Sequence, residues 1–250
     1  GKREYWELVM KVAKASTLNR VLRTTEIMGR KESDDLSAAQ ILYPCMQTAD
    51  IFGVMKCQVT QLGMDQRKVN MLAREVGPEL GFKKPVVVSH RMLRGLGAPV
   101  DNSEDATARA IAVKMSKSIP DSAIFMTDTE EDVKRKITKA YCMDGQVEEN
   151  PILEYCKHII FQAKFLKGQE DLLKDGFIVE RPEKWGGNIV FKTYEELEAA
   201  FAKKELSSID LKGAVIIYLN KLLQPVRNHF ETDANAKAIL EQVKSFQVTR

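Results

Sequence analysis

Three polar residues recur along one helical segment of the chain, and their spacing places them on one face. Tyr43, Gln47 and Asp50 lie at positions i, i+4 and i+7 of a largely apolar stretch, residues 36–53. A phenol, an amide and a carboxylate can together hydrogen-bond to the hydroxyl and amine groups of a small polar ligand. A carboxylate in apolar surroundings costs free energy unless it is hydrogen-bonded, so we expect Asp50 to have a dedicated partner, which a ligand can provide. The spacing alone also fits a face that is simply solvated.

A second group of polar residues follows at the end of a predicted strand. Residues 58–62 are strand-like and lead into Gly63, and residues 85–88 form a second, continuously apolar strand. Such a run is typical of a parallel sheet covered on both faces. Open parallel sheets bind ligands at the carboxyl ends of their strands. There Gly63 lets the backbone approach a ribose or phosphate closely, while Asp65 and Gln66 can hydrogen-bond to hydroxyl and amine groups.

A third candidate is a basic pentapeptide, KMSKS, at residues 114–118. It combines two ammonium groups with two hydroxyls, those of Lys114, Ser116, Lys117 and Ser118. Such a group can clamp a polyphosphate and stabilise charge as pyrophosphate leaves. The long Gly-, Asp- and Asn-rich segment 95–112 precedes it, as is typical of functional loops. Taken alone, the pentapeptide equally fits a solvated basic loop.

The elements that must position these residues change in type near residue 120. Before it, strand, glycine turn and helix follow one another as in a doubly wound α/β fold, with a helix from Asp65 that Gly77-Pro78 stops. After it the strands fade and helical periodicity dominates 121–250. The last strong helix, 210–229, has Asp210 as its natural N-cap. We therefore predict a doubly wound α/β domain over 1–120 and a helical domain over 121–250.

Composition excludes several classes of protein. The 250 residues carry a net charge of +3 and are 44% hydrophobic, which excludes intrinsic disorder of the whole chain but leaves RNA binding open. Local basic segments at 114–117 and 134–139 are where a polyanion is expected. No apolar run is long enough to span a membrane. Four scattered cysteines with no CxxC pair, and three histidines, indicate neither a zinc site nor a disulfide scaffold, and fit a reducing compartment.

The order of four motifs resembles the tyrosyl-tRNA synthetases of the archaeal and eukaryotic type. The motifs are YPCMQTADI at 43–51, GMDQRK at 63–68, KMSKS at 114–118 and RPEKWGG at 181–187, and the resemblance covers essentially the whole chain. KMSKS alone indicates a synthetase with a Rossmann catalytic domain, whereas the first two motifs together point to tyrosine. The family's HIGH-like motif does not occur, so we expect further strand and helix units upstream of Gly1.

The resemblance implies how tyrosine and ATP bind. Asp50 would accept the hydrogen bond of the phenolic hydroxyl of tyrosine, and the α-amino group would be held by Tyr43, Gln47 and Gln66. Gly63 and Asp65 would lie beside the ribose of ATP. The phosphates would be stabilised, as the tyrosine carboxylate attacks the α-phosphorus, by Lys114, Ser116, Lys117 and Ser118. Lys114 and Lys117 are the catalytic pair in this reading.

The resemblance also implies an RNA partner. Trp185 would stack on the first anticodon base of tRNA(Tyr), and Asp210 would hydrogen-bond to it. Without the resemblance, Trp185 could equally be a buried residue that packs at the domain interface, because aromatic residues are mostly buried. Asp210 has its capping role as the alternative, and one carboxylate can serve both.

The predicted activity is that of a tyrosine–tRNA ligase, which forms tyrosyl-adenylate from tyrosine and ATP and transfers the tyrosyl group to tRNA(Tyr). The resemblance implies Mg²⁺ on the ATP phosphates, no metal held by protein ligands alone, a homodimer or pseudo-dimer, and a cytoplasmic location without membrane contact. Two alternatives stay open at this stage. One is a tryptophanyl-tRNA synthetase, and the other is a noncatalytic tRNA-binding module that lacks the HIGH half.

Overall fold

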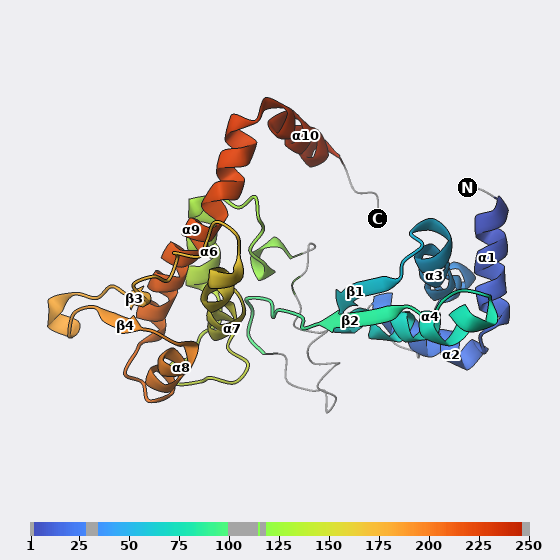
Figure 1. Ribbon diagram of the computed structural model, residues 1–250. Coiled ribbons are helices and arrows are strands. Elements are labelled where there is room, and N and C mark those ends of the chain that lie inside the picture. The colour runs from blue at the N-terminus through green and yellow to red at the C-terminus, as the bar shows by residue number, and fades with distance from the viewer. Residues whose placement is uncertain (1–2, 29–34, 100–114, 116–118, 247–250) are drawn as a thin grey trace. The chain divides into compact units, whose positions relative to one another are not determined.

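A computed structural model describes residues 3–28, 35–99, 115 and 119–246 of the chain (Figure 1). The described residues divide into two compact units, the first ending at Met92 and the second beginning at Leu93. The boundary therefore lies earlier in the chain than the predicted one at residue 120. The reason is Leu96, which is 2% exposed in the second unit's core and whose carbonyl accepts the Tyr141 N–H at 2.8 Å. The division between catalytic and anticodon-binding functions stays a prediction.

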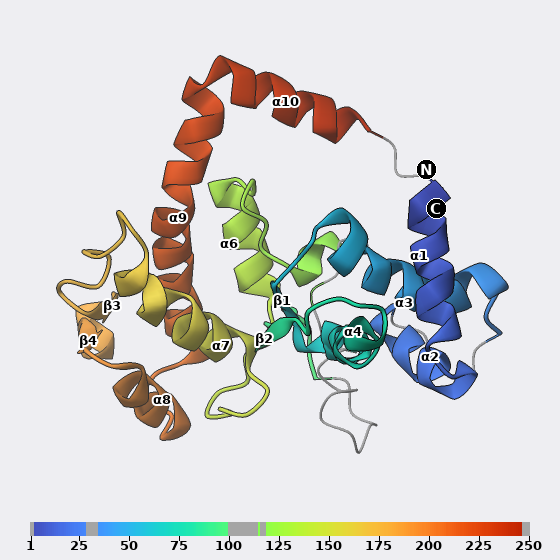
Figure 2. The same ribbon diagram turned by 45° about the vertical axis from the view of Figure 1, so that its right-hand side comes forward.

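The described part of the first unit contains four helices and a short sheet. The helices are α1 (Arg3–Lys14), α2 (Leu18–Thr24), α3 (Ala38–Ala49) and α4 (Arg67–Glu79). Local sequence sets their starts: the Thr17 hydroxyl caps α2, and Ser37 with Gln40 forms a capping box on α3. α3 contacts each of the other three helices and continues as a π-helical turn, Asp50–Val54 (Figure 2). The helical segment expected over 36–53 is confirmed.

The two strands of the first unit pair in parallel, as expected. β1 (Val59–Gly63) lies beside β2 (Val86–His90) in a register that runs from Val59 opposite Val86 to Gly63 opposite His90. Within the described part of this unit, the prediction of a sheet covered on both faces is wrong. Side chains alternate between faces. Thr60 is buried, whereas Val86 and Val88 are 56% and 47% exposed.

The helix after β1 does not stop at Gly77-Pro78, contrary to expectation. α4 runs on to Glu79 and ends where Gly81 adopts a φ of +81° and the Phe82 N–H bonds to the Gly77 carbonyl at 2.8 Å. Gly77 is needed for packing instead, since a Cβ there would lie 2.8 Å from the Phe52 ring.

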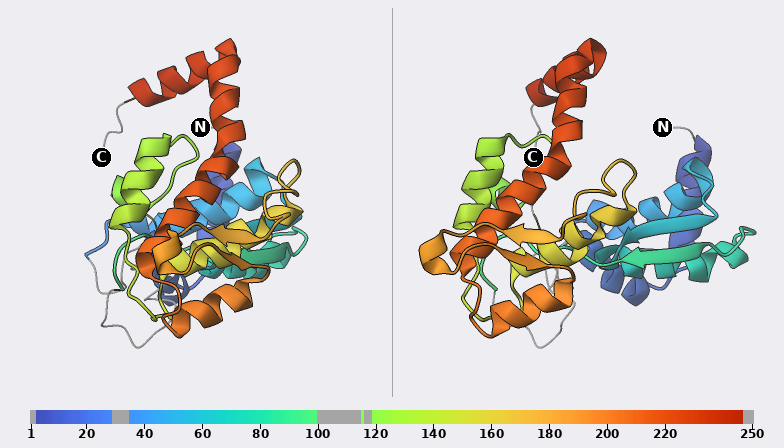
Figure 3. Two further views of the ribbon diagram at one scale, coloured as in Figure 1. Left: turned by 90° about the vertical axis from the view of Figure 1, so that its left-hand side faces the viewer. Right: turned by 60° about the vertical axis from the view of Figure 1, so that its left-hand side comes forward.

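The second unit is mainly helical. Its helices are α6 (Glu130–Lys139), α7 (Pro151–His158), α8 (Tyr194–Ala202), α9 (Ser208–Thr232) and α10 (Ala234–Ser245). Capping boxes at Thr129 and Thr193 start α6 and α8. α9, which continues through Pro225, packs against α6, α7 and α10 (Figure 3). No described helix is long and apolar enough to cross a membrane.

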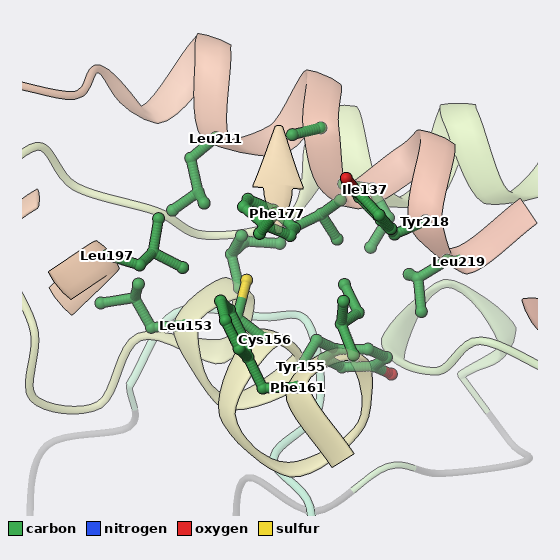
Figure 4. Close-up of a cluster of buried hydrophobic side chains, with 14 of the residues drawn as sticks. Ile137, Leu153, Tyr155, Cys156, Phe161, Phe177, Leu197, Leu211, Tyr218 and Leu219 are labelled. Carbon is green, nitrogen blue, oxygen red and sulfur yellow. The ribbon is translucent and has the colours of Figure 1, made fainter. Parts of the chain in front are cut away.

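The expectation that strands are lost after residue 120 is wrong in one place. β3 (Phe177–Val179) and β4 (Ile189–Phe191) pair antiparallel. The Phe177 ring stacks on Tyr218 of α9 with centroids 4.7 Å apart, at the centre of the buried cluster in Figure 4. The Tyr218 hydroxyl donates to the Gly176 carbonyl at 3.0 Å and accepts the Ile178 N–H at 2.8 Å. The strand pair is therefore fixed to α9.

Candidate functional site

The α3 face brings together two of the predicted site residues. Gln47, half-buried on α3, donates from Nε2 to Oε1 of Gln66 at 3.2 Å, a contact between residues 19 positions apart. Gln66 follows β1 in the short helical turn Met64–Gln66. Tyr43, one turn before Gln47 on α3, is 47% exposed. The structure thus places two amides from different elements side by side.

The orientation of the Gln66 amide follows from its other partners. Its Nε2 donates to the Ile27 carbonyl at 3.2 Å and to Oδ2 of Asp65 at 3.3 Å, which leaves Oε1 to accept from Gln47. Gln47 in turn uses its NH₂ group in that bond. Its carbonyl oxygen is therefore the group it can turn toward a cationic ligand.

Asp50 has a partner within the chain. The Tyr5 phenol of α1 lies beside the Asp50 carboxylate, and both side chains line one cavity. Burial is the largest cause that raises the pKa of Tyr5, followed by its polar interaction with Asp50 and by the negative charge of Asp50. The requirement for a dedicated partner is met in part by Tyr5. No periodicity signals this residue, because it lies far from Asp50 in sequence.

Gly63 stands at the carboxyl end of β1, as predicted. A Cβ at this position would lie 2.6 Å from Oδ1 of Asp65, so a larger residue here would displace the Asp65 side chain. His90, at the end of β2, pairs in register with Gly63. Gly63 and Asp65 therefore share the strand-end edge where a doubly wound sheet binds nucleotides.

Of the KMSKS segment, only Met115 is among the described residues. Its sulfur is 3.9 Å from the Tyr155 hydroxyl, and its side chain packs against the second unit's core. The predicted phosphate-binding residues, Lys114, Ser116, Lys117 and Ser118, lie outside the described residues. Their role stays a prediction.

Trp185 lies on an exposed turn of the second unit. It ends the 3₁₀ turn Glu183–Trp185 between β3 and β4 and is 67% exposed, so it is not part of that unit's core. The ammonium of Lys184 lies 5.7 Å from its ring centroid. Gly186 follows with a φ of 94°, a conformation that favours glycine. An exposed aromatic ring beside a lysine offers a stacking surface for a base.

Asp210 is not the N-cap of the last long helix, contrary to expectation. Ser207 caps α9: its hydroxyl accepts the Asp210 N–H at 3.1 Å and donates to Oδ2 of Asp210 at 2.8 Å. Asp210 therefore occupies the first turn, where the helix dipole favours a negative charge. A serine at that cap is as good a signal as an aspartate, and sequence alone does not choose between neighbouring candidates.

Arg181, not predicted as a site residue, ties the Trp185 turn to the segment before α9. Its Nε donates to the Gly187 carbonyl at 3.1 Å and its Nη1 to the Glu205 carbonyl at 3.5 Å. Ser208, at the start of α9, donates its N–H to Asp144 at 2.6 Å, and this bond lowers the pKa of Asp144. Arg181 thus joins the turn that bears Trp185 to Glu205, shortly before α9, and Asp144 binds the first residue of α9.

Comparison with known proteins identifies relatives for nearly the whole chain. A model of the class I tRNA synthetases for tryptophan and tyrosine matches residues 1–224. Tyrosine–tRNA ligase 1, cytoplasmic, of Arabidopsis thaliana is 49% identical over 99% of this chain and 58% of its own length. The tyrosine–tRNA ligase of Thermococcus sibiricus is 38% identical over 99% of this chain and 66% of its own length.

A solved structure gives the same result. The tyrosyl-tRNA synthetase of Pyrococcus horikoshii complexed with L-tyrosine superposes with a TM-score of 0.80 at 37% identity, covering 96% of this chain and 66% of that one. The chain therefore spans between about a half and two thirds of the length of these relatives.

Proposed function

The chain belongs to the class I tRNA synthetases for tryptophan and tyrosine, within them to the tyrosyl-tRNA synthetase family, and on this premise we propose that it acts in tyrosine–tRNA ligation. The first unit would carry part of a Rossmann-like catalytic domain and the second an anticodon-binding domain. The Gln47–Gln66 contact carries this proposal, because it joins two predicted tyrosine-binding residues from α3 and the turn after β1.

Tyrosine would bind along the α3 face. Gln47 uses its Nε2 in the bond to Gln66, and its carbonyl oxygen would accept from the α-ammonium, with Tyr43 and Gln66 beside it. Asp50 would accept the phenolic O–H. Phenylalanine would leave that acceptor without its hydrogen bond, which costs more than the bond itself contributes.

ATP would bind at the carboxyl end of β1. Gly63 and Asp65 would lie beside the ribose, and the phosphates would meet Lys114, Ser116, Lys117 and Ser118. These groups position the phosphates for in-line attack by the tyrosine carboxylate and neutralise charge on the leaving pyrophosphate. Mg²⁺ would arrive bound to phosphate oxygens, its preferred ligands in nucleotide sites. Among the described residues no cluster of three metal-ligating side chains occurs.

The experiment that tests this function is tyrosine-dependent exchange of pyrophosphate into ATP. It uses the protein in its natural full length, and offers tyrosine, tryptophan and phenylalanine separately. We expect exchange with tyrosine. Exchange with tryptophan instead would identify the related specificity, and no exchange with binding of tRNA(Tyr) retained would identify a noncatalytic module. The high identity to tyrosine–tRNA ligases favours tyrosine.

Trp185 and Asp210 would read the first anticodon base of tRNA(Tyr), the first by stacking and the second by hydrogen bonding. Their support is the exposed Trp185 ring and the contacts of Arg181 that hold the two segments together. A dimer that tRNA bridges, and a cytoplasmic location, remain part of this proposal.

Replacement of Trp185 by Ala is expected to lower kcat/KM for tRNA(Tyr) about tenfold, since stacking on one base contributes ~1–3 kcal/mol. Pyrophosphate exchange should stay unchanged, because the reaction of tyrosine with ATP does not involve the anticodon. Aminoacylation with varied tRNA concentration measures the effect. Phe165→Ala is the matched control: it removes another exposed aromatic ring of the second unit that also lies beside a lysine. Equal losses in both variants would contradict anticodon stacking by Trp185.

A further inference from the structure

Tyr5 lies beside the Asp50 carboxylate, to which the proposed function assigns the substrate hydroxyl. None of the sequence motifs includes Tyr5. It lies in the first turns of α1, whereas Asp50 opens the π-helical turn that follows α3. Both side chains line one cavity of about 820 Å³, together with Leu8 and Val54.

The position of Tyr5 is fixed by the packing of its helix. Val9 and Val12 of α1 are fully buried and belong to one core cluster with Cys45 and Ala49 of α3. Close to Asp50, Leu8 lies so near Gly53 that a Cβ at position 53 would be 2.7 Å from it. α1 therefore cannot shift relative to the π-helical turn without disturbing the core, and the phenol stays at the carboxylate.

The Asp50 carboxylate can accept hydrogen bonds from the Tyr5 phenol and from a substrate hydroxyl at the same time. An ionised carboxylate has two oxygens and about four acceptor sites, and it donates none. A hydrogen bond from the Tyr5 phenol would hold the Asp50 carboxylate in one orientation. The remaining acceptor sites can then receive one further O–H group. A phenolic substrate supplies that group, and its deoxy analogue does not.

We infer that Tyr5 is a positioning residue that orients Asp50 and thereby helps the site select tyrosine over phenylalanine. This inference rests on the proposed function. Tyr5 acts through Asp50 and needs no contact with the reacting carboxylate or phosphates. Its contribution therefore belongs to substrate binding and discrimination, and not to the chemical step.

The test compares Tyr5→Phe with the unsubstituted enzyme in pyrophosphate exchange with tyrosine and with phenylalanine, using the protein in its natural full length. We expect kcat/KM for tyrosine to fall about tenfold, mainly through KM, while kcat changes less than about threefold. The tyrosine-to-phenylalanine ratio of kcat/KM should fall about tenfold as well. This ratio does not depend on the folded fraction, so it reports on selection even if the variant is less stable.

The control is Tyr141→Phe, which removes a hydroxyl that donates to Gln146 at 2.7 Å in the second unit. It should leave both the KM for tyrosine and the selectivity ratio unchanged. An unchanged ratio in Tyr5→Phe, with an active unsubstituted enzyme, would overturn this inference alone. Inactivity of the unsubstituted enzyme would overturn the proposed function and this inference with it.

Discussion

Replacement of Asp50 by Asn is expected to lower kcat/KM for tyrosine about 100-fold, since hydrogen bonds to charged groups contribute ~1.5–3 kcal/mol. Asparagine keeps the size of the side chain but replaces an ionised acceptor by a neutral amide. Phenylalanine, which has no hydroxyl, should lose no rate and should react somewhat faster, because the substitution removes the carboxylate that phenylalanine leaves without a hydrogen bond. Selection between the two amino acids therefore decreases chiefly through the loss of tyrosine binding.

Pyrophosphate exchange at varied tyrosine and phenylalanine concentrations measures both values. Glu79→Gln is the matched control, because it neutralises an exposed carboxylate of α4 in the same unit. This control should behave as the unsubstituted enzyme. If Asp50→Asn retained full selectivity for tyrosine, another residue would have to read the hydroxyl, and the assignment of Asp50 would be wrong.

Replacement of Lys136 by Met is expected to lower the free energy of unfolding of the second unit by about 3–5 kcal/mol, the usual cost of removing one partner from a buried ion pair. Lys136 is 3% exposed, and its ammonium bonds to Asp128 at 2.7 Å and to the Ala123 carbonyl at 3.0 Å. It also lies 4.5 Å from the centroid of the Phe125 ring. Methionine fills the space of the stem but leaves the Asp128 carboxylate without this cation.

Urea unfolding followed by circular dichroism measures the loss. Hydrogen exchange of α6 and α9, compared with that of α1, locates it in the second unit. Lys139→Met on the same helix is the control, because Lys139 is exposed and its replacement should change stability by less than about 0.5 kcal/mol. The double variant Lys136→Met/Asp128→Asn should recover part of the loss, since it also removes the unpaired charge. An equal loss of stability in Lys136→Met and in Lys139→Met would show that the buried pair does not stabilise the unit.

Lys136 also shows why charge patterns along the sequence are an incomplete guide. Residues 134–139 predict a basic surface, yet one of their lysines is buried and Arg135 pairs with Asp121 at 2.6 Å and with Asp132 at 3.3 Å. These partners lie partly outside the helix, so the helical sequence does not reveal them. A run of cations becomes a polyanion site only if packing leaves their charges exposed and unpaired.

The strand predictions have a similar limit. β3 and β4 are three residues each, too short for the alternation from which a strand is recognised. They form because Phe177 stacks on Tyr218 and because the Tyr218 hydroxyl bonds to the backbone on either side of that phenylalanine. Both contacts come from α9, which lies far along the chain.

The sequence by itself determined the helices with strong periodicity and caps, the parallel pair β1–β2, and the order of motifs that places the chain in its family. These features depend on residues close together in the chain. Only the tertiary structure decided that Gln66 orients toward Gln47, that Tyr5 meets Asp50, and that Ser207 caps α9. Contacts between distant residues depend on how helices pack, and the choice among neighbouring caps depends on where the backbone turns. Local spacing specifies neither.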